Sequence, residues 1–69
     1  MPLYKGFHIE TIEDEPGKFK AVIRKANGGT LRTVVPPGPD APAITTQLYL
    51  RAEDAMVEAK RAIDAGGIV

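Results

Sequence analysis

The sequence contains neither cysteine nor serine, and these absences remove several kinds of chemistry. Without cysteine, the chain has no disulfide framework, no cysteine-based zinc site and no thiol nucleophile. A cysteine-free composition also fits a reducing compartment. Without serine, a Ser-His-Asp triad is excluded. The only histidine is His8, which has no second histidine with which to share a metal ion.

Long apolar runs are missing as well. No stretch approaches the ~20 residues that a membrane-spanning helix requires. The segment 1–6 lacks the basic flank followed by an apolar stretch that defines a signal peptide. The sequence therefore predicts a cytoplasmic protein with no membrane partner.

The chain also lacks net charge, because its 9 basic and 9 acidic residues cancel. The balance hides an asymmetry, since acidic residues are absent from Lys18 to Val35 and outnumber basic residues after Pro36. The basic residues of the first stretch are Lys18, Lys20, Arg24, Lys25 and Arg32. This pattern predicts a bipolar surface and excludes a protein that attracts polyanions through its overall charge.

A chain of 69 residues makes one domain, 1–69, close to the lower size limit for independent folding. Such a domain has a core worth on the order of 3–5 kcal/mol. The loss of one large buried side chain is therefore enough to threaten the fold.

Three segments show the alternation of apolar and polar residues that is typical of strands, at about 3–12, 18–26 and 30–35. Gly6 within the first segment indicates a bulge or a close approach of another backbone. In the second segment, alternation places Phe19, Ala21 and Ile23 on one face, and Lys20, Val22 and Arg24 on the other.

Two turn signals connect these segments into an antiparallel meander. Pro16-Gly17 predicts a type II turn, with a positive φ at Gly17. Asn27-Gly28 predicts a tight hairpin, because both residues accept positive φ. The third segment is accordingly expected to return beside the second.

A proline-rich loop at 36–43 separates the predicted strands from the C-terminal third. The segment 45–50 is predicted as an extended segment or short fourth strand, the alternative being a helix that begins at Thr46. A helix is predicted at about 52–65. The apolar stripe of this helix consists of Ala52, Met56, Ala59 and Ile63. Arg51 is a poor N-cap, because its side chain offers no acceptor, and Gly66 is expected to end the helix. The fold class is therefore α+β, a three- to four-stranded antiparallel meander covered on one face by a single C-terminal helix.

The remaining motifs favour no catalytic, cofactor or metal site. The acidic run 13–15 lacks the ligand spacing of a calcium loop and is followed by a proline. The glycines at 28–29 join two predicted strands, whereas a loop that cradles phosphate must open a helix. His8 is expected on the outer face of its strand as a solvated or cross-strand-paired residue. We expect a protein that is not an enzyme.

Two kinds of partner remain, and both would use the basic stretch at 18–32. One is a protein, either an unknown partner or a second copy that covers an apolar spot made by Val22 and Val34. The alternative is a nucleic acid that binds the predicted basic hairpin. The candidate contact residues are the same in both cases, namely Lys18, Lys20, Arg24, Lys25 and Arg32. Zero net charge and the lack of aromatic residues at 18–24 on the polar face favour the protein partner.

Three segments resemble a group of very small proteins from alphaproteobacteria. They are Tyr4-Lys5-Gly6-Phe7-His8-Ile9, Phe19-Lys20-Ala21-Val22-Ile23 and the helical run 55–64, which ends in Ile63-Asp64. The chain departs from that group at the helix start, where Arg51-Ala52-Glu53-Asp54 replaces a Thr-Pro-Glu-Glu-like cap. The resemblance implies a bacterial protein with an antiparallel sheet and a C-terminal helix (β-β-β-α), and it implies no site residues.

Overall fold

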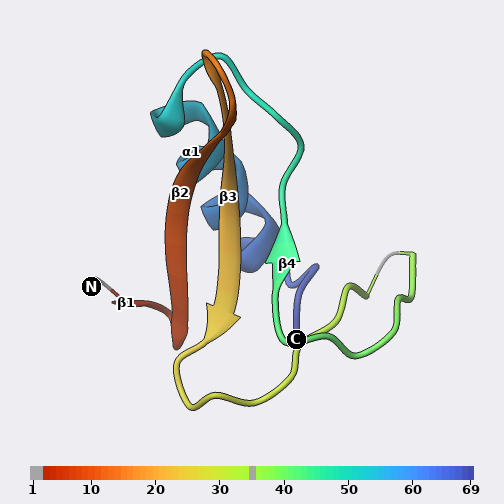
Figure 1. Ribbon diagram of the computed structural model, residues 1–69. Helices are drawn as coiled ribbons and strands as arrows, with labels where there is room; N and C mark the ends of the chain where they lie inside the picture. Colours follow the sequence, from red (N-terminus) through yellow and green to blue (C-terminus); the bar gives the residue numbers. More distant parts are fainter. Residues whose placement is uncertain (1–2, 35) are drawn as a thin grey trace.

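The computed structural model describes residues 3–34 and 36–69. Its elements are β1 (Leu3–Tyr4), β2 (Phe7–Glu15), β3 (Lys18–Lys25), β4 (Ile44–Thr45) and α1 (Ala52–Asp64). The strands form one antiparallel sheet in the order β1-β2-β3-β4, and α1 packs across β2 and β3 (Figure 1). The predicted fold class is confirmed.

The first predicted strand, 3–12, is two strands joined by a tight turn. Tyr4 pairs with Phe7, and the two residues between them have positive φ, 51° at Lys5 and 86° at Gly6. This is the conformation of a type I′ hairpin turn, which suits glycine well and lysine poorly. Gly6 is therefore a turn residue with open space where a Cβ would lie, and the prediction of a bulge or a close approach of another backbone was wrong.

The turn between β2 and β3 is the one predicted from Pro16-Gly17. β2 and β3 form a hairpin around Pro16-Gly17, and Gly17 has the expected positive φ of 75°. The Gly17 amide also donates to Oε2 of Glu13 at 2.9 Å, close to an irregularity in the ladder between Glu13 and Glu15. This carboxylate therefore supports the turn.

The predicted third strand at 30–35 does not join the sheet. Gly28 has positive φ but Asn27 does not, so the turn lacks type I′ geometry, and the Asn27 side chain accepts from the Gly29 amide at 2.8 Å. The chain leaves β3 instead of returning along it. Leu31 pairs with Ala41, and Thr33 pairs with Ile68. The last residue of this prediction, Val35, lies outside the described residues.

The place beside β3 is taken by the segment after the proline-rich loop. Ile44 and Thr45 pair with β3, and the ladder resumes where Tyr49 and Phe19 exchange two backbone hydrogen bonds of 2.7 Å. Between them the Thr46 hydroxyl accepts from the Ala21 amide at 3.0 Å, which interrupts the regular strand. The prediction of an extended segment is confirmed, and the alternative of a helix from Thr46 was wrong.

The helix has the ends that its sequence predicts. Arg51 is the N-cap, with extended backbone and no side-chain capping hydrogen bond. At the other end, Gly66 has a φ of 73°, its amide donates to the Ile63 carbonyl at 3.0 Å, and the Gly67 amide donates to the Ala62 carbonyl at 3.0 Å. This pair of bonds is a Schellman motif. With no N-cap side chain, the start of α1 depends on packing for its stability.

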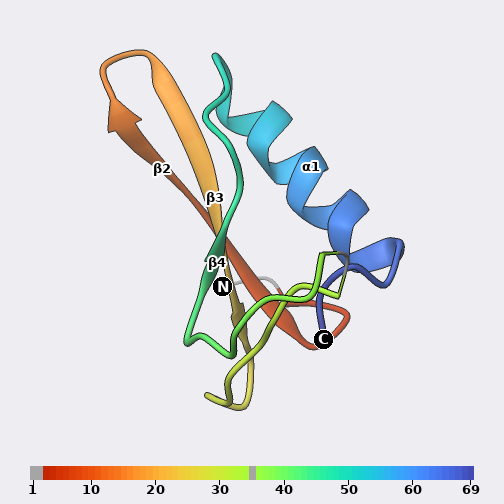
Figure 2. The ribbon, with the colours of Figure 1, turned by 90° about the vertical axis from the view of Figure 1, so that its right-hand side faces the viewer.

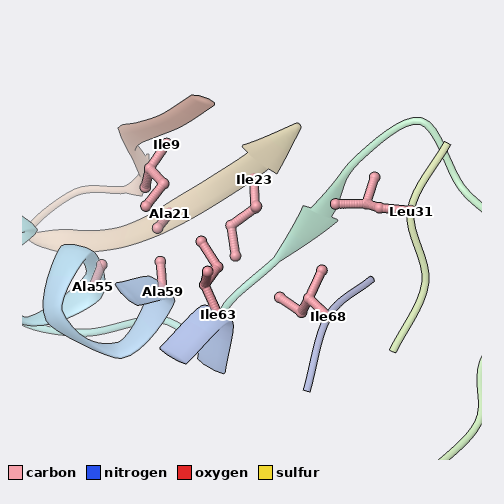
Figure 3. Packing of buried hydrophobic residues seen from close by; sticks show 8 residues of the cluster. All are labelled: Ile9, Ala21, Ile23, Leu31, Ala55, Ala59, Ile63 and Ile68. Atoms are coloured by element: carbon pink, nitrogen blue, oxygen red, sulfur yellow. The ribbon is translucent and has the colours of Figure 1, made fainter. Parts of the chain in front are cut away.

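The core joins three parts of the chain (Figure 3). Ala59 and Ile63 from the predicted helix stripe are buried, whereas Ala52 and Met56 are only half-buried, and Ala55 is a buried residue that the stripe missed. The whole cluster comprises Ile9, Ala21 and Ile23 of the sheet, Ala55, Ala59 and Ile63 of α1, and Leu31 and Ile68 from segments outside both. The segments that carry Leu31 and Ile68 extend the core sideways, past β4.

Candidate interaction surface

One face of the sheet has no element packed on it among the described residues. In Figure 2 the helix, the proline-rich loop and the C-terminal segment all lie to the same side of β2, β3 and β4. The strand register places alternate residues on the opposite side, which we call the uncovered face. Its members are His8, Glu10 and Ile12 of β2, Lys20, Val22 and Arg24 of β3, and Thr45 of β4.

Val22 gives the uncovered face an apolar centre. Its cross-strand neighbours are Glu10 on one side and Thr45 on the other, and Val22 is only 7% exposed. Ile12, one pair further along β2, is half-buried. Val22 therefore has little apolar surface left to bury, and Ile12 is the residue through which this face still gains free energy when a partner covers it.

The charges of this face have two different environments. Lys20 lies 3.3 Å from Asp14, so its charge is already neutralised by a neighbour. Glu10 and Arg24 have no opposite charge within 4.0 Å in the described part of the chain. The uncovered face therefore presents one negative and one positive group that are open to an external partner.

The structure does not gather the predicted basic contact residues on one surface. Lys20 and Arg24 share the uncovered face, whereas Lys18 lies at the end of β3, 3.7 Å from Glu15, and Lys25 pairs with Phe7 on the helix side. Arg32 belongs to the segment after β3 and lies 3.9 Å from Asp40. The hairpin expected to unite them is absent, because 30–34 forms no strand beside β3.

The apolar spot predicted from Val22 and Val34 does not form either. Val34 lies in the segment after β3, where its amide donates to the Gly67 carbonyl at 2.9 Å. Val22 is on β3, and its register neighbours are Glu10 and Thr45. Ile12, which the sequence analysis did not single out, is the apolar residue near Val22 on this face.

His8 lies on the uncovered face, paired with Arg24 on β3 and with Leu3 on β1. Its Nδ1 atom is enclosed and has no hydrogen-bond partner. Within 3–34 and 36–69, no three histidine, aspartate or glutamate residues gather closely enough to hold a metal ion. His8 therefore lacks the neighbours that a metal site would need.

A shallow groove of about 500 Å³ lies on the helix side of the β4 edge. Ile23, Ile44, Ala62 and Ile68 supply apolar surface, and Thr33, Thr46, Gln47, Tyr49 and Glu58 supply polar groups. Its single carboxylate, Glu58, lies 3.4 Å from Arg61, and no histidine or lysine lines the groove to act as its acid–base partner. The groove offers hydrogen-bonding groups rather than an activated nucleophile.

A charged cluster that no sequence motif predicted joins the first hairpin to the end of the helix. The Tyr4 hydroxyl donates to the Asp64 carboxylate at 2.9 and 2.7 Å, and Lys5 Nζ lies 2.6 Å from Asp64 Oδ1. Lys60 Nζ lies 5.3 Å from the centre of the Tyr4 ring, within the range of a cation–π contact. Tyr4 and Asp64 both lie in segments of the resemblance, but no sequence pattern shows that they meet.

The hydrogen bonds of this cluster shift three pKa values. The Lys5 ammonium and then the Tyr4 hydroxyl, by bonding to Asp64, hold the pKa of that carboxyl below its ordinary value. The same bonds raise the pKa of Tyr4 and the pKa of Lys5. The cluster therefore stabilises the fold fully only while Asp64 is ionised and Tyr4 and Lys5 are protonated.

Asp64→Asn is expected to lower the melting temperature most near neutral pH. A lowered carboxyl pKa contributes stability above about pH 4 that is lost as the pH falls. Raised Tyr4 and Lys5 pKa values contribute stability below about pH 10 that is lost as the pH rises. Thermal unfolding of both proteins from well below pH 4 to well above pH 10 should show their melting temperatures converging at each extreme.

Tyr4→Phe is the matched variant, because it removes the hydroxyl and leaves the Lys5–Asp64 pair in place. Its destabilisation should be smaller than that of Asp64→Asn. If the difference in melting temperature between wild type and Asp64→Asn is the same at pH 3 as at pH 7, the charges of the cluster do not contribute to stability.

Comparison with known proteins identifies no relative. No protein-family model matches the chain, and neither the curated proteins nor the solved structures contain a significantly similar one. The resemblance to small alphaproteobacterial proteins therefore stays a prediction. In the part of the chain that the structure describes, no helix is long and apolar enough to cross a membrane.

Proposed function

We propose that the protein is a small, non-enzymatic protein-interaction module that docks a protein partner on its uncovered face. The observation that carries the proposal is the half-buried Ile12 beside Val22, next to Glu10 and Arg24, which have no opposite charge within 4.0 Å among the described residues. A desolvated apolar centre with a charged rim is the usual anatomy of a protein–protein contact. A fitting partner offers an apolar side chain for Ile12 and charges of both signs.

Nucleic-acid binding stays the alternative prediction. Ribbon-type recognition needs several cations directed at phosphates, and these would be free of acidic neighbours. Of the five predicted contact residues, Lys18, Lys20 and Arg32 each lie within 4.0 Å of a carboxylate, and Arg24 and Lys25 have none at that distance among the described residues. This arrangement supports a protein partner over a polyanion.

The proposal is tested by placing a photo-crosslinking residue at Ile12 and, as the control, at Val57. Val57 is 52% exposed on the outer face of α1, and Ile12 is half-buried on the uncovered face, so a neighbouring protein can contact either side chain. We expect a specific protein adduct from position 12 in cells and none from position 57. Adding the reversals Glu10→Lys and Arg24→Glu to the position-12 protein should abolish the adduct.

Two outcomes would contradict the proposal. One is an adduct that forms equally from both positions or survives the charge reversals. The other is a set of amide shifts at Lys20 and Arg24 that appears when duplex DNA or RNA is added at low salt and vanishes at high salt. The second outcome would favour the nucleic-acid alternative, because phosphate contacts weaken steeply as salt increases.

A further inference from the structure

The turn after β3 contains the single asparagine of the chain, Asn27, which is followed directly by Gly28 and Gly29. Residues 26–30 are all exposed, so water reaches the asparagine side chain. Figure 1 shows this turn at the end of the sheet opposite the Pro16-Gly17 turn. The function proposed above uses none of these residues.

The Asn27 side chain folds along the backbone that follows it. Its Oδ1 atom accepts a hydrogen bond of 2.8 Å from the Gly29 amide. Such a bond draws electron density away from the carboxamide carbon, Cγ, in the way that an oxyanion-hole donor activates a carbonyl. The carboxamide is therefore polarised toward attack by a nucleophile.

The nearest nucleophile along the chain is the backbone nitrogen of Gly28. Its attack on Cγ of Asn27 is intramolecular and gains the advantage in entropy of a ring closure. Gly28 has no Cβ to hinder the approach, and its φ of 79° is a conformation that glycine adopts freely. Its N–H donates to the Lys25 carbonyl at 3.1 Å, so this one turn bond must open first. Local opening of an exposed turn costs little free energy.

We propose that Asn27 is a site of spontaneous deamidation in the folded protein. The Gly28 nitrogen bonds to Cγ and passes its proton through water to Nδ2, the Cγ–Nδ2 bond breaks, and ammonia leaves. The product is a cyclic imide, which water then opens at one of its two carbonyls. Opening at the side-chain carbonyl gives aspartate, and opening at the main-chain carbonyl gives isoaspartate.

The aspartate product fits the turn. Its carboxylate still accepts from the Gly29 amide, and a charged acceptor makes this bond stronger. A Cβ placed on Gly29 would lie 3.0 Å from Asn27 Oδ1 and 3.7 Å from Lys25 Cδ, so both side chains lie on one side of the turn. Lys25 has no carboxylate within 4.0 Å among the described residues. The new charge therefore gains a cationic neighbour.

The isoaspartate product does not fit the turn, because it adds a methylene to the backbone between β3 and Leu31. Leu31 is 1% exposed in the core, and its backbone exchanges two hydrogen bonds of 2.9 Å with Ala41. A longer path between β3 and this anchor changes the position at which Leu31 enters the core. The isoaspartyl protein should therefore be less stable than the aspartyl protein.

Peptide mapping by mass spectrometry during incubation at neutral pH measures the reaction. Conversion of Asn27 in the folded protein should proceed within about tenfold of the rate in a synthetic peptide of residues 22–33, because the exposed turn opens locally. Asn27→Gln is the matched control and should stay unconverted, since its longer side chain closes the ring more slowly. A folded protein that reacts more slowly than this limit would overturn the proposal.

The products give a second measurement. Aspartate and isoaspartate should both form, and aspartate alone would contradict the cyclic intermediate. In urea unfolding, Asn27→Asp should have the midpoint of the wild type, and the isoaspartyl form, separated by chromatography, should have a lower one. Equal midpoints for the isoaspartyl form and Asn27→Asp would overturn the inferred effect on Leu31.

Discussion

Leu31→Ala is expected to leave much of the protein unfolded at room temperature. Leu31 is 1% exposed and, with Ile23, is one of the largest fully buried side chains among the described residues. Leucine-to-alanine changes in cores cost roughly 2–5 kcal/mol. A domain of this size has a core worth only about 3–5 kcal/mol, so the two quantities are comparable.

The position of Leu31 makes this result informative. It lies outside the sheet and the helix, in a segment held by its two backbone hydrogen bonds of 2.9 Å with Ala41. Figure 3 shows its side chain beyond β4, extending the cluster that contains Ile68. The loss of this side chain should therefore loosen the proline-rich loop and the C-terminal segment together.

Urea unfolding followed by circular dichroism measures the effect. Leu50→Ala is the matched control, because Leu50 is 76% exposed and its truncation should change stability by no more than about 0.5 kcal/mol. Similar urea midpoints for Leu31→Ala and Leu50→Ala would show that the segment after β3 does not belong to the cooperative core.

Ala59→Leu is expected to have the second-largest effect. Ala59 and Ala21 are both fully buried, and in Figure 3 their side chains face each other between α1 and β3. Small side chains at both positions let the helix lie close to the sheet. A leucine would have to displace the helix or adopt a strained rotamer, and overpacking of this kind costs typically about 1–3 kcal/mol.

The control for this substitution is Val57→Leu, which places the same leucine side chain on the exposed side of the same helix. Thermal unfolding should show a clear loss of stability for Ala59→Leu and almost none for Val57→Leu. If Ala59→Leu melts like the wild type, the interface between α1 and β3 must have room that the structure does not show.

The helix was predictable because its signals are local. The apolar spacing of Ala59 and Ile63, the poor cap at Arg51 and the glycine at 66 each depend on neighbouring residues alone. The same holds for Pro16-Gly17, where the two residues themselves specify the turn. Ala55 escaped the prediction because the apolar stripe was placed through the larger Met56 beside it, whereas the small size of Ala55 is what fits it to the interface.

The partner of β3 was not predictable in this way. The segments 30–35 and 44–50 have similar alternation, so their local patterns do not decide which one lies beside β3. Asn27-Gly28 favours the nearer segment, but Asn27 does not adopt the positive φ that a type I′ turn requires. The basic surface predicted at 18–32 depended on that hairpin. It does not form, because Arg32 lies in the segment after β3, beside Asp40.

The sequence by itself determined the α+β class, the C-terminal helix and the turn between β2 and β3, because each follows from residues a few positions apart. The tertiary structure alone decided that Ile44 and Thr45 complete the sheet, that Leu31 and Ile68 are buried, and that Tyr4 meets Asp64 across 60 positions of the chain. These features reflect competition between distant segments for the same core and the same strand edge. The outcome of such a competition depends on the total surface buried, which no local pattern records.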